Sequence, residues 1–146
     1  MVSARHVGRG LMAVTVVALI NGSCSSSSAQ PPTAGQRITV SLRDFKLSVS
    51  PTRVAAGSAV FSVLNDGPED HEFIVVRSNA AVLPLRADGV TIDEETLEPT
   101  KIAALEPGQP GETRQLRVRL SPGHYTVFCN MAGHYLSGMH EDLVVT

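Results

Sequence analysis

Apolar and polar positions alternate along most of residues 37–146. Apolar side chains recur at every second position, the period of a strand with one buried face, in RITVSLRDF, KLSVSP, SAVFSVLN and TRQLRVRL. Turn residues separate the segments, for example at residues 65–68 and 121–123, and shorter β-branched runs follow in HEFIVVR, HYTVFC and EDLVVT. The pattern predicts an all-β sandwich of two sheets with about seven to eight strands over residues 37–146.

Residues 79–109 interrupt this alternation. They contain prolines and a short stretch with helical character, TIDEETLEPTKIAAL, which includes the acidic cluster DEET. We predict a long connection between the two halves of the sandwich, with a turn or two of helix capped at its start by Thr91 or Asp93.

The N-terminal residues 1–23 have the organisation of a secretory signal peptide. Arg5 and Arg9 form a basic region, and the apolar run that follows is too short to span a bilayer. The segment LINGSC resembles the lipobox of bacterial lipoproteins, in which Cys24 would be acylated. Residues 24–36 are rich in serine and proline and predict a tether. The alternative is cleavage near Ala29, which would release a periplasmic or secreted protein.

Charge and composition argue against some classes of function, nucleic-acid binding among them. The formal net charge is −2, and removing the two arginines of residues 1–23 leaves ten basic residues against 14 acidic residues. No basic stripe accompanies aromatic residues, so we expect no nucleic-acid partner. We expect a monomeric domain in the cell envelope, either tethered to the membrane and facing outward or free.

The segment FCNMAGHYLSGMHED spaces Cys129, His134 and Met139 at equal intervals. If Cys24 is acylated or removed, Cys129 is an unpaired thiol in an oxidising compartment, where a metal would hold it. A metal site, a catalytic thiol and coincidence are the three explanations to weigh.

A fourth side chain completes a metal-binding set. In GHYTVFC the period of two places Cys129 at the end of an inward-facing row, where the loop with His134 and Met139 begins. His71 begins the segment HEFIVV after a tight turn, and it joins them if these two strands are neighbours. Two histidines, a cysteine and a weak axial methionine are the ligands of a blue-copper electron-transfer site.

These motifs resemble the cupredoxin family of small copper proteins. The resemblance rests on an H-x-F segment, a P-G-x-Y-x-x-x-C strand and a C-x4-H-x4-M loop, and the loop spacing is similar to the auracyanin, rusticyanin and sulfocyanin branch. The matching residues are His71, Phe73, Pro122, Gly123, Tyr125, Cys129, His134 and Met139.

The resemblance implies a Greek-key sandwich with one copper ion that cycles between Cu(I) and Cu(II), and redox proteins as partners. Glu72 and Asn130 are then expected to hydrogen-bond between the two ligand loops. The docking surface for partners is expected at an apolar rim beside His134, formed by Met131, Ala132, Tyr135 and Leu136.

Two other functions compete with electron transfer. A thiol enzyme using Cys129 and His134 would leave Met139 and His71 without roles, so we expect no enzyme. A copper-scavenging or copper-delivery lipoprotein could use the same four residues, and the colour of the copper-loaded protein would separate it from an electron carrier.

Overall fold

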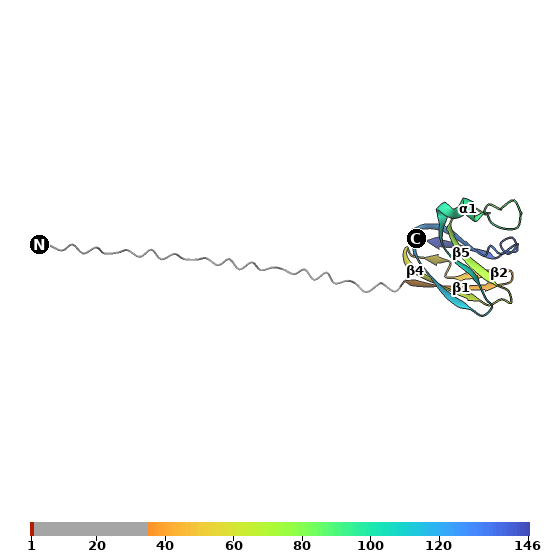
Figure 1. Cartoon of the computed structure of the whole chain (residues 1–146), viewed down its shortest axis with the longest axis horizontal. Helices are drawn as coiled ribbons and strands as arrows, with labels where there is room; N and C mark the ends of the chain where they lie inside the picture. Colours follow the sequence, from red (N-terminus) through yellow and green to blue (C-terminus); the bar gives the residue numbers. More distant parts are fainter. Residues whose placement is uncertain (2–34) are drawn as a thin grey trace. The chain divides into compact units, whose positions relative to one another are not determined.

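The computed structural model describes residue 1 and residues 35–146, and the described residues form nine strands and two short helical segments (Figure 1). The predicted signal peptide, Cys24 and nearly all of the predicted tether lie outside the described residues. The elements are β1 (Gln36–Arg43), β2 (Lys46–Ser50), β3 (Arg53–Val54), β4 (Gly57–Asn65), β5 (His71–Arg77), α1 (Glu94–Leu97), the 3-10 segment η1 (Glu98–Thr100), β6 (Lys101–Gly108), β7 (Thr113–Leu120), β8 (Gly123–Phe128) and β9 (His140–Val145).

The strands form two sheets, which confirms the predicted all-β sandwich. The first sheet has the order β2-β1-β4-β7, and the second has the order β3-β9-β8-β5-β6. Strand β1 pairs with β4 in parallel and β3 with β9 in parallel, whereas the other pairs are antiparallel. The chain crosses between the sheets several times, as in Greek-key sandwiches.

The main core lies between the two sheets. In β4 every second side chain is buried, and in β8 the inward-facing row consists of Tyr125, Val127 and then Cys129, as the alternation predicted. Further core residues from the two sheets are Ile38, Val40, Leu42, Phe61, Val63, Phe73, Val75, Leu143 and Val145. Cys129 is therefore part of the core, one residue beyond the end of β8.

A second, smaller core covers the outer face of the second sheet. Ile74 and Val76 of β5 point away from the main core and pack with Leu83, Ile92 and Leu97 of the following connection. Both faces of β5 are therefore buried, which explains its continuous apolar run. Figure 1 shows α1 on the far side of β5 from β1 and β2.

The connection predicted for residues 79–109 is shorter in the structure, because β6 occupies Lys101–Gly108 at the edge of the second sheet. At this edge position the side chains of residues 101–106 alternate between half-buried and exposed. Small and charged residues occupy both kinds of position, so the sequence shows no clear strand pattern. The helical turn is present, and Asp93 caps it by accepting a hydrogen bond from the Thr96 backbone N–H. Within the described residues, no helix is long and apolar enough to cross a membrane.

Candidate metal centre

Three potential metal ligands meet at one end of the sandwich. His71 is the first residue of β5, Cys129 follows β8, and His134 lies in the next loop. Their ligand atoms all lie within 4.8 Å of one another, and all three residues are buried. Strands β5 and β8 are antiparallel neighbours, with Ile74 opposite Phe128, so the pairing that the sequence prediction required is present.

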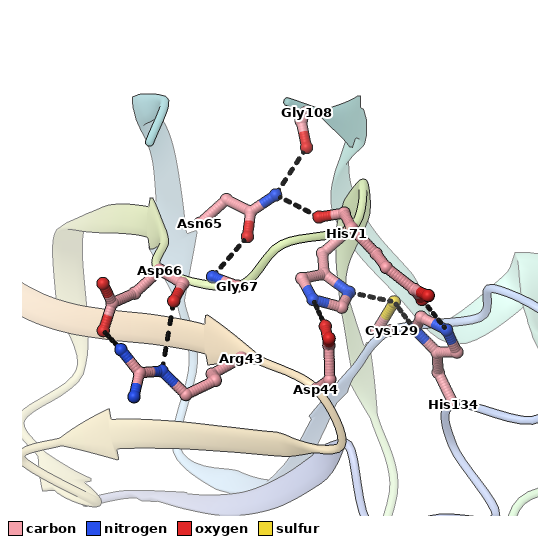
Figure 2. A network of polar contacts seen from close by, with 10 residues as sticks. Arg43, Asp44, Asn65, Asp66, Gly67, His71, Gly108, Cys129 and His134 are labelled. Atoms are coloured by element: carbon pink, nitrogen blue, oxygen red, sulfur yellow. Dashed lines mark hydrogen bonds and ion pairs between the residues drawn. The ribbon is translucent and has the colours of Figure 1, made fainter. Parts of the chain in front are cut away.

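The side-chain nitrogens that face the cysteine can be assigned. The Nδ1 atom of His134 lies 3.6 Å from Cys129 Sγ, and the Nδ1 atom of His71 lies 3.9 Å from the same sulfur. Figure 2 shows the sulfur between the two imidazole rings. Both Nδ1 atoms therefore point into the space where a metal ion would bind.

Met139, the fourth predicted ligand, is fully buried in the same core cluster as Cys129. Its backbone N–H donates to the carbonyl of His134 at 3.0 Å, and its carbonyl accepts from the N–H of Cys129 at 3.0 Å. These two bonds close the loop between β8 and β9 on itself. They bring the two ends of the ligand loop together.

The turn between β4 and β5 places His71, and one buried asparagine organises this turn. The Asn65 amide donates to the backbone carbonyls of Glu69 and Gly108, each at 2.8 Å, and its oxygen accepts from the Gly67 N–H at 3.0 Å. Figure 2 shows these three bonds beside His71. The sequence indicated a turn here, but not that Asn65 is buried and holds it.

Each ligand histidine also contacts a carboxylate through the nitrogen that faces away from the cysteine. Asp44 Oδ1 lies 2.8 Å from His71 Nε2, and Glu69 Oε2 lies 3.5 Å from His134 Nε2. Neither carboxylate was predicted as a site residue. Asp44 lies between β1 and β2, 27 residues before His71, and no local motif connects the two.

The expected link between Glu72 and Asn130 involves the Asn130 backbone, and the described contacts hold no bond from Glu72 to the Asn130 side-chain amide. The Asn130 side chain accepts from the N–H of Ile92, and donates to the carbonyl of Ile92 and to Glu94. Asn130 therefore fastens the ligand loop to the connection before α1. Glu72 instead approaches the backbone N–H of Asn130.

The surface beside His134 also differs from the prediction. Ala132 and Leu136 are exposed and Met131 is half-buried, as a rim requires, but Tyr135 is only 4% exposed. The Tyr135 ring packs on Phe128, and its hydroxyl oxygen accepts from the Leu83 N–H, so this residue belongs to the second core.

The sequence analysis missed one aromatic residue at this surface. Phe45 is 49% exposed, and its ring meets the His134 imidazole edge-on with 5.2 Å between ring centroids. Phe45 comes from the first sheet's β1–β2 turn, so sequence spacing could not connect it to the ligand loop. His140, beside Met139, is exposed and stacks on Tyr135 at 4.6 Å, outside the ligand cluster.

Burial disfavours the charged forms of three side chains at the site. It raises the pKa of the Cys129 thiol to about 11, although the backbone N–H groups of Met131 and Glu72 act in the opposite direction. Burial, followed by the neighbouring His71, lowers the pKa of His134. Burial, followed by repulsion from Glu94, raises the pKa of Glu72 to about 7. A metal must therefore displace the thiol proton.

The donor set fits copper. Thiolate and thioether sulfurs are soft ligands that suit Cu(I), and imidazole suits both copper oxidation states. The three clustered donors are buried in one place and need no long-range movement to meet a common ion. The residues present therefore agree with the ligand set expected from the sequence.

No family model and no curated protein sequence matches the chain. Solved structures do match it. Auracyanin from Roseiflexus castenholzii is 20% identical with a TM-score of 0.56, over 75% of this chain and 96% of the other. Auracyanin A, a "blue" copper protein from Chloroflexus aurantiacus, is 19% identical with a TM-score of 0.52, over 76% and 100%. Rusticyanin from Thiobacillus ferrooxidans is 17% identical with a TM-score of 0.52, over 75% and 76%. The described domain therefore has the cupredoxin fold.

Proposed function

We propose that this chain binds one copper ion and carries single electrons between redox proteins outside the cytoplasm. The observation that carries the proposal is the convergence of His71, Cys129 and His134 in a buried cluster on the cupredoxin fold. Met139 supplies the weak fourth ligand in this proposal.

The rigidity of the site supports electron transfer. When bound, copper supplies the one-electron chemistry, by cycling between Cu(I) and Cu(II). The protein holds the ligands in place through the Asn65 bonds on one side and the Cys129–Met139–His134 backbone bonds on the other. A ligand set that moves little between two oxidation states keeps the reorganisation on electron transfer small.

The proposed partner surface surrounds His134, whose side chain is 8% exposed. Ala132, Leu136 and Phe45 are exposed around it and present apolar side chains to an incoming protein. Apolar cores of this kind exclude water at protein–protein interfaces. Electrons would then pass between copper and the partner through the His134 ring.

Burial argues against a thiol enzyme. Cys129 is fully buried, and its pKa is raised to about 11 by that burial, so little reactive thiolate exists near neutral pH. Copper scavenging or delivery remains the second candidate because it would use the same ligands. The enclosed ligands favour retention of the ion over rapid release.

We also propose export, with acylation of Cys24 and residues 24–36 as a tether. This part rests on the sequence, because Cys24 lies outside the described residues. A lipid anchor would hold an electron carrier close to membrane-bound redox partners.

A spectroscopic comparison tests the proposal. The purified, copper-loaded protein is expected to show an intense visible charge-transfer band that a mild reductant bleaches reversibly. Cys129→Ser should lose this band while circular dichroism shows an intact β-sandwich. The matched control, Cys24→Ser, should keep the band but leave the membrane fraction. A colourless wild type with readily exchanged Cu(I) would favour delivery, and an unchanged band in Cys129→Ser would remove Cys129 from the site.

A further inference from the structure

The two ligand histidines differ in how their outer nitrogens are held. The Asp44–His71 contact is 2.8 Å long, with the His71 side chain fully buried and that of Asp44 21% exposed. The Glu69–His134 contact is 3.5 Å long, and the Glu69 side chain is 61% exposed. Water screens the second contact far more than the first, so only Asp44 forms a strong, sheltered bond to a ligand.

We propose that Asp44 is a positioning residue that orients His71 for metal binding and lowers the reduction potential of the bound copper. The second half of this inference rests on the proposed function, whereas the first half concerns the histidine alone. Figure 2 shows the geometry, with the His71 ring between the Asp44 carboxylate and the Cys129 sulfur.

The contact determines which nitrogen carries the proton. An ionised carboxylate can only accept hydrogen bonds, so a 2.8 Å contact requires a proton on His71 Nε2. In the neutral ring the Nδ1 atom, which faces Cys129 Sγ at 3.9 Å, then keeps its lone pair for a metal. Asp44 thus selects the His71 tautomer whose Nδ1 atom can bind a metal.

The backbone covers this bond closely. A Cβ atom at Gly67 would lie 2.9 Å from both Asp44 Oδ1 and His71 Nε2, so only glycine allows the turn to approach this far. The turn is fastened to the end of β1 by the Asp66 N–H, which donates to the Leu42 carbonyl at 2.8 Å, and by the ion pair of Arg43 with Asp66. The glycine thus shelters the carboxylate–imidazole pair from water.

The charge of Asp44 acts on the metal through His71. Within residues 35–146, the ion pair recorded for Asp44 is the one with His71, while the adjacent Arg43 pairs with Asp66. A hydrogen bond from imidazole to a carboxylate increases the basicity of the ligand. A nearby negative charge also favours the more positive Cu(II) over Cu(I), so both effects lower the potential.

Two substitutions separate orientation from charge. Asp44→Asn keeps an oxygen that can accept from Nε2–H but removes the charge, whereas Asp44→Ala removes both. Asp66→Asn is the charge control: it removes a carboxylate and its ion pair with Arg43 from the same region, while the Asp66 N–H bond to Leu42 and the Asp44–His71 contact remain. Glu69→Gln makes the equivalent change at His134.

Three measurements test the inference: the His71 tautomer from nitrogen NMR shifts of the metal-free protein, zinc affinity, and the potential of the copper-loaded protein. Asp44→Ala should mix the two tautomers and weaken zinc binding about 10- to 100-fold. Asp44→Asn should keep the tautomer and raise the potential, by more than Asp66→Asn or Glu69→Gln does.

If the Asp44→Ala variant keeps the wild-type His71 tautomer and the wild-type zinc affinity, Asp44 does not orient His71. An Asp44→Asn potential that matches wild type, or shifts no more than Asp66→Asn, would overturn the tuning role. If Asp44→Ala does not fold, Gly67→Ala takes its place. The added alanine Cβ would force Asp44 and His71 apart, while every charged side chain remains. The tautomer and zinc measurements test the orienting role without copper. A copper-loaded wild type that shows no charge-transfer band would therefore count against the proposed function but not against the orienting role.

Discussion

At the scale of single residues, the site combines a reactive side chain with surroundings that suppress its reactivity. Cys129 lies in the core, and burial raises its pKa to about 11, so the metal-free protein carries a neutral thiol near neutral pH. Burial also lowers the pKa of His134, which keeps that ring neutral and ready to bind. Protons therefore compete with the metal mainly at the thiol.

This competition predicts how metal affinity depends on pH. The metal-free protein holds the Cys129 proton below about pH 11 and the complex does not, so raising the pH favours the complex. Zinc affinity should rise about tenfold per pH unit between about pH 7 and 9, where His134 is already neutral. Competition titrations with a chelator of known pH dependence measure the slope, and Cys129→Ser is the control. A wild-type affinity independent of pH in this range would contradict the assignment.

The proposed role of Met139 is tested by a change of one donor atom. Thioether sulfur stabilises Cu(I), whereas an amide oxygen is harder and favours Cu(II), so Met139→Gln should lower the reduction potential. Copper should still bind, because Cys129, His71 and His134 remain. Voltammetry of both proteins in one buffer measures the shift. A blue glutamine variant with an unchanged or higher potential would show that Met139 is not the axial ligand.

At the scale of elements, two loops build the site, and each is closed by hydrogen bonds of its own. The loop between β8 and β9 is closed by the backbone bonds of Met139, and the turn between β4 and β5 is closed by the Asn65 side chain. Asn65 links this turn to Gly108 at the end of β6, so β4, β6 and the turn meet at one amide. The position of His71 depends on this junction.

Asn65→Ala should therefore weaken both the fold and the site. It leaves the Gly108 and Glu69 carbonyls and the Gly67 N–H without their partner, at a cost of about 1–3 kcal/mol for a buried polar group left unpaired. Zinc affinity should fall as well, because the turn that carries His71 loosens. Urea unfolding and zinc titration measure the two effects. Asn79→Ala, at an exposed residue, should change neither, and wild-type values for Asn65→Ala would refute the role.

At the scale of the whole molecule, the two sheets contribute different parts of the site. The predicted ligands all come from the second sheet and its loops, whereas Asp44 and Phe45 come from the β1–β2 turn of the first sheet. Packing of the two sheets therefore brings the carboxylate to His71 and the aromatic ring to His134. Metal binding and the proposed partner docking would both depend on that packing.

The proposed docking surface predicts a selective kinetic defect. Leu136 is 51% exposed, and Leu136→Lys places a charge in the apolar rim while every proposed ligand is kept. Electron exchange with the physiological partner should slow, while the visible spectrum and the potential stay unchanged. Ile102→Lys is the control, because Ile102 is exposed near the end of β6 that lies away from His71. Equal slowing by both variants, or by neither, would place docking elsewhere.

Local sequence was sufficient for most of the strands and for naming the predicted ligands. A strand's side chains alternate whatever it packs against, so the pattern of β1, β2, β4, β7 and β8 could be recognised directly. Cys129, His134 and Met139 lie in one loop, and loop spacing limits how far apart they can be. Edge strand β6 was missed because its residue types do not follow its burial: Lys101 is half-buried, whereas Ile102 is exposed.

Only the tertiary structure decided what surrounds the ligands. Asp44 and Phe45 reach the site because two sheets pack together, and contacts between distant segments leave no local spacing in the chain. Tyr135 had the apolar character of a rim residue, but the connection after β5 covers it, so it became part of the second core. The Asn130 side chain bonds to Ile92 for the same reason, because the packed connection places the Ile92 N–H and carbonyl beside its amide. Residue types and short spacings therefore determined which atoms can bind a metal, whereas packing decided which groups orient, shield and expose them.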